Sequence, residues 1–357
     1  MKLGNMSLGP ILGASGVEGN FGEGYWYHKL LHGFSLLDLS GLVFVSKTAT
    51  LNPRKGNTPF VYDENYFSPS EIKPKSIVIK PFQKNVLNAV GLGNPGLEAL
   101  LKTGHYQSRK DPFLISIMSI AGSEDSRKAE MAKMIAILEK YKNEFQSLFG
   151  LQINLSCPNT AHDPCSLIAE SSDMIGIAAR LGVPLMPKFS IASAPIAALM
   201  ELNENPHVDA ICLSNTLPYD WQPSENLYRI SKGDDYFEDF QRLQRRGFIS
   251  WKSDGKTVYI VTFINWEKIF GTTESPLASM GGGGLSGDII RPFVLHYIKQ
   301  LRAEGFSKPI NGGGGIMKPE HVDMYKAVGV NSVFIGSVVM TRPWDAEDII
   351  KRANEIF

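Results

Sequence analysis

Apolar and polar positions follow two alternating patterns from one end of the chain to the other. Short continuous apolar runs, typical of strands buried on both faces, are each followed by a longer segment with helical spacing. The expected strands are Pro10–Ser15, Leu42–Lys47, Phe113–Met118, Leu151–Ser156, Pro184–Phe189, Val208–Ser214, Lys308–Gly313 and Asn331–Gly336. The expected helices cover residues 22–33, 94–104, 125–146, 171–181, 194–203, 287–304, 318–328 and 344–356. The third is the clearest, with Ala129, Ala132, Ile135, Leu138, Tyr141 and Phe145 at helical spacing.

Eight strand–helix pairs predict an α/β fold, a (β/α)8 TIM barrel, with a doubly wound open sheet as the alternative. Such a barrel needs ~250 residues, and two long excursions, residues 48–93 and 217–283, hold most of the remainder of this 357-residue chain. Both follow a strand and precede a helix, so both are expected on the C-terminal face, where barrel enzymes keep their sites. We therefore expect one domain, 1–357, with 217–283 as an inserted subdomain or lid.

The second excursion contains elements of its own. Asp234–Arg246 reads as a helix, and Phe248–Lys252 and Lys256–Phe263 flank the turn Ser253-Asp254-Gly255. Its aromatic residues predict a small separate core; a lid, a dimer surface and a different substrate pocket are the alternatives.

Composition narrows the classes of partner. Lysine plus arginine and aspartate plus glutamate each total 36, so charge gives no reason to expect nucleic acid or an anionic membrane. No apolar run approaches the ~20 residues that span a bilayer, and the N-terminus has no signal-peptide pattern. Three cysteines in a chain of this length favour a reducing, cytoplasmic location and exclude a self-contained iron–sulfur cluster.

Polar and glycine residues gather where the expected strands end, and these ends share one face of a barrel. Gly312–Gly315 and Gly336-Ser337 follow the seventh and eighth strands, the usual phosphate site of this fold; tight turns are the alternative use of such glycines. The others are Ser15-Gly16, Lys47-Thr48, Ser116, Asn154, Cys157, Asn159, Lys188 and Asn215-Thr216.

The three cysteines have different surroundings. Cys212 lies within a strand and is expected to pack as a small apolar group, and Cys165 has no evident role. Cys157 lies in the polar loop Asn154-Leu155-Ser156-Cys157-Pro158-Asn159-Thr160. A thiol with an ordinary pKa near ~8.5 is a competent base at neutral pH when cations favour the thiolate, so we predict that Cys157 is the catalytic base; an inert cysteine is the alternative.

Seven short motifs in order resemble the dihydroorotate dehydrogenase family across most of the chain. Asn154–Asn159 resembles the family's catalytic loop, in the cysteine form of the soluble class (class 1). The other motifs are Ser46–Leu51 with Arg54–Asn57, Asn88–Leu92, Ser214–Thr216, Gly284–Gly287, Gly314–Ile316 and Ile335–Ser337.

The resemblance implies an FMN enzyme that oxidises dihydroorotate to orotate in pyrimidine biosynthesis. It implies that Cys157 takes the C5 proton while hydride passes from C6 to flavin N5, and it makes a homodimer the expected assembly. It places Lys47, Asn88, Asn154, Asn159, Asn215 and Thr216 at the substrate. It places Ala14, Ser15, Lys47, Asn154, Lys188, Gly287, Gly314, Gly315, Gly336 and Ser337 at the flavin, and no metal is implied.

Two other functions stay open at this point. One is an FMN oxidoreductase acting on another pyrimidine or unsaturated ring, with the 217–283 insert reshaping the pocket. The other is a non-catalytic binding module. The electron acceptor is also open: fumarate fits a stand-alone soluble enzyme, and NAD would need a partner that carries flavin and iron–sulfur centres.

Overall fold

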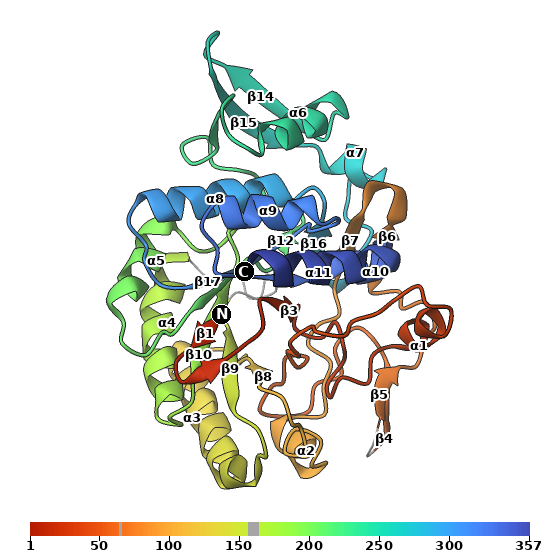
Figure 1. The fold of residues 1–357 in the computed structure, drawn as a ribbon, viewed down its shortest axis with the longest axis vertical. Helices are drawn as coiled ribbons and strands as arrows, with labels where there is room; N and C mark the ends of the chain where they lie inside the picture. The colour runs from red at the N-terminus through yellow and green to blue at the C-terminus, as the bar shows by residue number, and fades with distance from the viewer. Residues whose placement is uncertain (64–65, 156–163) are drawn as a thin grey trace.

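A ring of parallel strands forms the centre of the computed structural model, which describes residues 1–63, 66–155 and 164–357 (Figure 1). Seven strands make one parallel sheet, and the segment that holds Val43 and Val45 closes it. Val43 bridges Leu12 on one side, and Val45 bridges Leu114 on the other. In spatial order the strands are β3 (Ile11–Gly13), β18 (Ser332–Ile335), β17 (Ile310–Gly313), β11 (Ile211–Leu213), β10 (Leu185–Phe189), β9 (Phe149–Asn154) and β8 (Phe113–Ile117).

Spatial order therefore follows chain order around a closed ring, and each of the eight predicted strands has its place in it. The (β/α)8 barrel is confirmed and the open doubly wound sheet is wrong. Helices follow the strands as predicted: α1 (Trp26–Gly33), α2 (Leu97–Lys102), α3 (Glu124–Tyr141), α4 (Pro164–Ala179), α5 (Ile196–Glu201), α8 (Arg291–Ala303), α9 (Glu320–Ala327) and α11 (Ala346–Ile356). The short helix α10 (Ser337–Thr341), before α11, was not predicted.

Alternate strand residues divide the apolar core into an inner and an outer layer. Leu12 and Leu114 belong to a buried cluster inside the ring, whereas Ile11 and Ile115 belong to the larger cluster between strands and helices. Cys212 lies in the inner cluster and is 2% exposed, so it packs as the small apolar group that was predicted. The N-terminal hairpin of β1 (Lys2–Leu3) and β2 (Met6–Ser7) adds Leu3 and Met6 to this inner layer.

The two excursions are joined by a sheet that the sequence did not predict. The first contains β4 (Phe60–Asp63), β5 (Tyr66–Pro69), β6 (Ile77–Lys80) and β7 (Asn85–Asn88). The second begins with β12 (Leu217–Pro218), and β16 (Gly284–Gly287) follows it. Four of these strands form an antiparallel sheet in the order β12-β16-β7-β6, which ties both excursions together beside the carboxyl ends of the barrel strands. The other two, β4 and β5, pair with each other in a separate sheet.

The rest of the insert lies beyond α8, at the top of Figure 1. It contains α6 (Phe237–Arg245), α7 (Trp266–Phe270) and a sheet of β13 (Arg229–Ser231), β15 (Val258–Ile264) and β14 (Ile249–Ser253). The predicted helix and hairpin are confirmed. Phe293 of α8 meets Tyr228 and Phe240 edge-on, with ring centroids 5.3 and 5.0 Å away. The insert aromatics therefore form a small core that is shared with α8.

None of the described helices combines the length and the apolarity that crossing a bilayer requires.

Candidate active site

A cavity of about 560 Å³ opens at the carboxyl ends of the barrel strands, between the ring and the sheet that contains β7 and β16. Its volume falls in the ~300–1,000 Å³ range of small-molecule and cofactor pockets. Most of the residues that the sequence singled out come together there. The lining includes Ala14, Ser15, Lys47, Asn88, Asn154, Lys188, Asn215, Thr216, Gly314, Gly315, Gly336 and Ser337.

Lys47 places one buried amine in this cavity. It follows the bridged segment that closes the ring, and it is 8% exposed. Its ammonium group donates to the carbonyl of Gly93 and lies 4.7 Å from the ring centroid of Phe60. Burial lowers the pKa of Lys47 to about 7, against the opposing charge of Glu23. A small change in its surroundings therefore switches its charge near neutral pH.

Lys188 supplies a second buried amine. It lies in β10 next to Asn154 of β9 on one side and Cys212 of β11 on the other, and it is 9% exposed. Burial raises the pKa of the Cys212 thiol to about 12, with Lys188 opposing that shift. Cys212 is therefore a neutral packing residue, whereas Lys188 brings a basic group into the cavity wall.

The amides form a row that comes from the ends of three strands, β9, β11 and β7. Asn154 Oδ1 accepts a hydrogen bond from Asn215 Nδ2 at 3.2 Å, and Asn215 Oδ1 accepts one from the Thr216 amide at 2.9 Å. Asn88 approaches from β7 and donates to the carbonyl of Gly284 at 3.4 Å. This row offers fixed donors and acceptors to a polar ring and would not suit an apolar ligand.

Glycines form the opposite wall, after β17 and β18. Gly314 and Gly315 have φ angles of +129° and +76°, which side chains other than glycine rarely adopt. A Cβ atom on Gly315 would overlap the carbonyl oxygen of Gly287. Ser337 donates to Ser286 Oγ at 2.8 Å and links this wall to β16.

Gly287 is the described site residue that does not line the cavity. Its φ is +115°, and a Cβ atom there would overlap the carbonyl of Lys84. Its carbonyl oxygen packs against Gly315. Gly287 therefore supports the glycine wall from behind. Cys157 and Asn159 lie outside the described residues, and their roles stay predictions.

The prediction from the sequence did not include the apolar and aromatic residues that line the cavity. Tyr25, Trp26 and Tyr27 contribute from the start of α1, and Tyr25 donates to the carbonyl of Gly16 at 2.7 Å. Trp26 Nε1 donates to the carbonyl of Ile72 at 3.2 Å, which joins α1 to the first excursion. Three consecutive aromatic residues at a strand-to-helix connection were the available signal. The remaining missed residues include Phe60, Ile77, Ile79, Val86, Ser286, Ile290 and Met340.

No residue of the 217–283 insert lines the cavity, and the whole insert lies within the part of the chain that the structure describes. The part of the first excursion around residues 71–79 lines it instead. Any influence of the insert on the pocket is therefore indirect in this structure.

The closed ring, the polar cavity at its carboxyl end and the glycine turns after the last two strands are together typical of α/β-barrel enzymes. The sequence model of the dihydroorotate dehydrogenase family matches residues 3–179 of this chain. The chain belongs to that family. The match includes the loop that was compared with the family's catalytic loop.

Curated relatives extend the similarity over the rest of the chain. The catalytic subunit of dihydroorotate dehydrogenase B (NAD(+)) from Streptococcus pneumoniae is 26% identical, over 97% of this chain and 88% of that protein. The protein of the same name from Listeria innocua is 26% identical, over 97% of this chain and 90% of that protein. The crystal structure of DHODH from Eimeria tenella in complex with ferulenol superposes with a TM-score of 0.58 at 15% identity, over 97% of this chain and 81% of that one, which supports the barrel fold.

Proposed function

We propose that this chain is a flavin oxidoreductase that oxidises dihydroorotate to orotate, with FMN as the hydride acceptor, in pyrimidine biosynthesis. The observation that carries the proposal is the convergence of residues from separate family motifs on one cavity. Lys47, Asn88, Asn154, Thr216 and Gly315 lie far apart in the sequence, yet all line it. The names of the curated relatives support the same reaction.

The donor set of the cavity fits FMN. The glycine wall at Gly314, Gly315 and Gly336-Ser337 leaves backbone groups accessible to a phosphate, with Gly287 as its support. Ala14 and Ser15 would border the flavin, and Lys188 would offset negative charge on its ring. When bound, FMN supplies the acceptor for the hydride that leaves C6 of the substrate.

The amide row would hold the pyrimidine ring. Dihydroorotate presents alternating N–H and C=O groups, which Asn88, Asn154, Asn215 and Thr216 can pair, and we assign the same role to Asn159. A ligand without these groups would displace water from the cavity and leave the remaining hydrogen-bonding capacity of the amides unmatched, at ~1–3 kcal/mol for each group that loses a partner. This pattern favours dihydroorotate over an apolar unsaturated ring.

Cys157 would remove the proton from C5. It lies three residues after Asn154 in the sequence, in the loop that resembles the family's catalytic loop. Buried basic groups at Lys47 and Lys188 favour a thiolate at this end of the barrel. Loss of the C5 proton and of the C6 hydride together create the C5–C6 double bond of orotate.

Lys47 gives orotate binding a pH dependence. The substrate carboxylate favours the charged ammonium, so the pKa of Lys47 should rise in the complex from about 7 without ligand. Orotate affinity should then be constant below pH 7 and weaken as pH rises above it, by up to about tenfold per pH unit. The measurement is the dissociation constant of orotate between pH 6 and 9.

Lys47→Met separates the contribution of this lysine from that of a thiol, because the ordinary pKa of a cysteine, ~8.5, lies in the same pH range. The variant should bind orotate about tenfold or more weakly at pH 6, with little pH dependence. If Lys47→Met kept the pH slope of the wild type, Lys47 would not be the group that pairs with the carboxylate.

We propose NAD+ as the final electron acceptor, reached through a partner protein that carries further redox centres. The relatives from Streptococcus and Listeria support this choice, because both are named catalytic subunits of an NAD(+) enzyme. Within the described residues, no group of three or more His, Cys, Asp and Glu side chains could hold a metal ion. Homodimerisation of this chain and a cytoplasmic location are part of the same proposal.

The proposal is tested first on the purified protein. A yellow protein whose released flavin has the mass of FMN, and whose absorption spectrum shifts on addition of orotate, is the expected result. A colourless protein that binds no added FMN would support a non-catalytic binding module instead. An FMN protein with no response to orotate would favour another ring substrate.

A further inference from the structure

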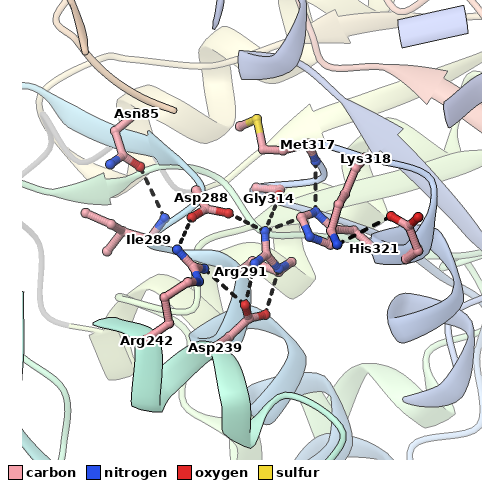
Figure 2. A network of polar contacts seen from close by, with 12 residues as sticks. Asn85, Asp239, Arg242, Asp288, Ile289, Arg291, Gly314, Met317, Lys318 and His321 are labelled. Atoms are coloured by element: carbon pink, nitrogen blue, oxygen red, sulfur yellow. Dashed lines mark hydrogen bonds and ion pairs between the residues drawn. The ribbon is translucent and has the colours of Figure 1, made fainter. Parts of the chain in front are cut away.

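Arg291 is a buried cation behind the glycine wall. It is the first residue of α8, and it is 1% exposed. Its guanidinium makes a bidentate pair with Asp239, with Nε–Oδ2 and Nη2–Oδ1 distances of 2.9 and 2.7 Å (Figure 2). Nη1 donates to Asp288 Oδ1 at 2.6 Å. The side chain is thus fixed from two sides.

Half of this network comes from the insert. Asp239 and Arg242 lie on α6, whereas Asp288 lies in the turn after β16 and Arg291 is the first residue of α8. Arg242 donates to Asp288 at 2.5 Å and to Asp239 at 3.0 Å, which closes a ring of two cations and two carboxylates (Figure 2). Burial acts to raise the pKa of Asp239, but Arg291 and Arg242 outweigh it and hold that pKa below its ordinary value. Both carboxylates are therefore charged at neutral pH.

The network contacts the glycine wall through the remaining bonds of Arg291. Nη1 donates to the carbonyl oxygen of Gly315 at 2.8 Å and lies 3.0 Å from His321 Nδ1. The same Nδ1 accepts the backbone N–H of Met317 at 3.0 Å. Burial, together with the charge of Arg291, lowers the pKa of His321 to about 3, so the ring is neutral and Nδ1 is an acceptor. The segment from Gly315 to Met317 is thus held at both ends.

We propose that Asp239 of the insert is a positioning residue for the flavin phosphate, acting through Arg291 on the backbone of Gly315. The inference rests on the proposed function, because it needs FMN at this wall. The Gly315 carbonyl is engaged on the network side, while Gly315 itself lines the cavity. Without the bidentate partner, Arg291 has Asp288, which it shares with Arg242, as its remaining ion-pair partner in this network. The guanidinium is then free to turn and to release the Gly315 carbonyl.

The direction in which FMN affinity changes when the Asp239 carboxylate is removed distinguishes a positioning role from a purely electrostatic one. A carboxylate that acted only by its charge would repel the phosphate, and its removal would strengthen FMN binding. Loss of positioning weakens FMN binding and leaves the isoalloxazine contacts intact. Riboflavin, which lacks the phosphate, serves as the probe for those contacts.

The experiment compares Asp239→Asn with the wild type, using flavin-free protein titrated with FMN or riboflavin and flavin fluorescence as the readout. The preference for FMN over riboflavin should fall about tenfold in the variant, with riboflavin affinity unchanged. Asp234→Asn is the matched control. Asp234 also ties the insert to α8, through Lys299 at 2.6 Å. Within the described residues it forms no hydrogen bond or ion pair with Asp239, Arg242, Asp288 or Arg291, so this variant should keep the wild-type preference.

Each outcome decides the inference. An Asp239→Asn protein with an unchanged or increased FMN preference overturns it, and so does an equal fall in Asp234→Asn. If Asp239→Asn does not fold, Arg242→Gln replaces it and must show a reduced preference in the same direction; an unchanged preference again overturns the inference. A wild-type protein that binds neither flavin would instead contradict the proposed function.

Discussion

Replacement of Cys157 by alanine should leave FMN bound and slow flavin reduction by dihydroorotate about 10²–10⁴-fold, the usual contribution of a general base. Alanine cannot accept the C5 proton, and the amides and lysines of the cavity remain to bind the substrate. The measurement is the anaerobic rate at which dihydroorotate bleaches the flavin. The dissociation constant of orotate should change little, because the thiol acts on the proton and not on ring binding.

Cys165→Ala is the matched control for this experiment. The sequence indicates no role for Cys165, so its alanine variant should reduce at the wild-type rate. Wild-type-like bleaching in Cys157→Ala would assign the base to another residue and remove the cysteine-based mechanism.

Gly315→Ala should abolish FMN binding at micromolar flavin. The φ of +76° at this position costs a non-glycine residue ~1–2 kcal/mol, and the new methyl group would overlap the Gly287 carbonyl and come within 2.9 Å of Arg291 Cβ. The wall must therefore move, and the backbone that faces the cavity moves with it. The measurement is the flavin content of the purified variant and its FMN dissociation constant.

Gly305→Ala is the control for the conformational cost of a positive φ alone. Gly305 has a φ of +96°, and its Cβ would meet no atom within 4 Å, so the variant pays a similar conformational cost away from the cavity. It should lose a similar, small part of its stability and keep its FMN. If Gly315→Ala bound FMN normally, the glycine wall would not hold the phosphate.

The barrel could be predicted from the sequence because its strands are continuous apolar runs with a helix after each. The second strand shows the limit of that reasoning. Residues 42–47 predict a strand, but Val43 and Val45 make only isolated bridges. The side chain of Ser46 accepts the backbone N–H of Ser116 at 2.9 Å. This side-chain bond takes the place of a backbone hydrogen bond between strands. The spacing of apolar residues in the sequence cannot reveal such a substitution.

The helical face of α3 was displaced by part of a turn from its prediction. Ala129 is exposed, whereas Met131 and Met134 are buried with Ile135 and Leu138. Alanine is small enough for either environment, so its spacing carried little information. In the structure α3 begins with the acidic first turn Glu124-Asp125, and Ser123 is the cap that accepts the Ser126 amide.

The sheet between the excursions was not readable because its partners are about 200 residues apart in the chain. Gly284 pairs with Asn88, and Gly287 with Asn85. The glycine run 281–284 resembles a flexible turn in the sequence. In the structure, Gly284 is a strand residue whose Cβ would overlap Thr216, so close packing requires the glycine.

The polar cavity residues were predictable because a parallel barrel brings its strand ends together. The Arg291 network was not, because Asp239, Arg242 and Asp288 read as ordinary charged positions on helix surfaces. Only the packing of the insert on α8 turns them into a buried ion cluster. The aromatic lining residues Tyr25, Trp26 and Tyr27 were not predicted either, because their position depends on contacts with the first excursion, such as the bond from Trp26 to Ile72.

Anaerobic titration of the purified protein with dihydroorotate tests the central proposal most directly. The flavin absorbance should bleach, and one equivalent of orotate should form for each flavin reduced. A flavin that stays oxidised in excess dihydroorotate, although dithionite reduces it, would contradict the account.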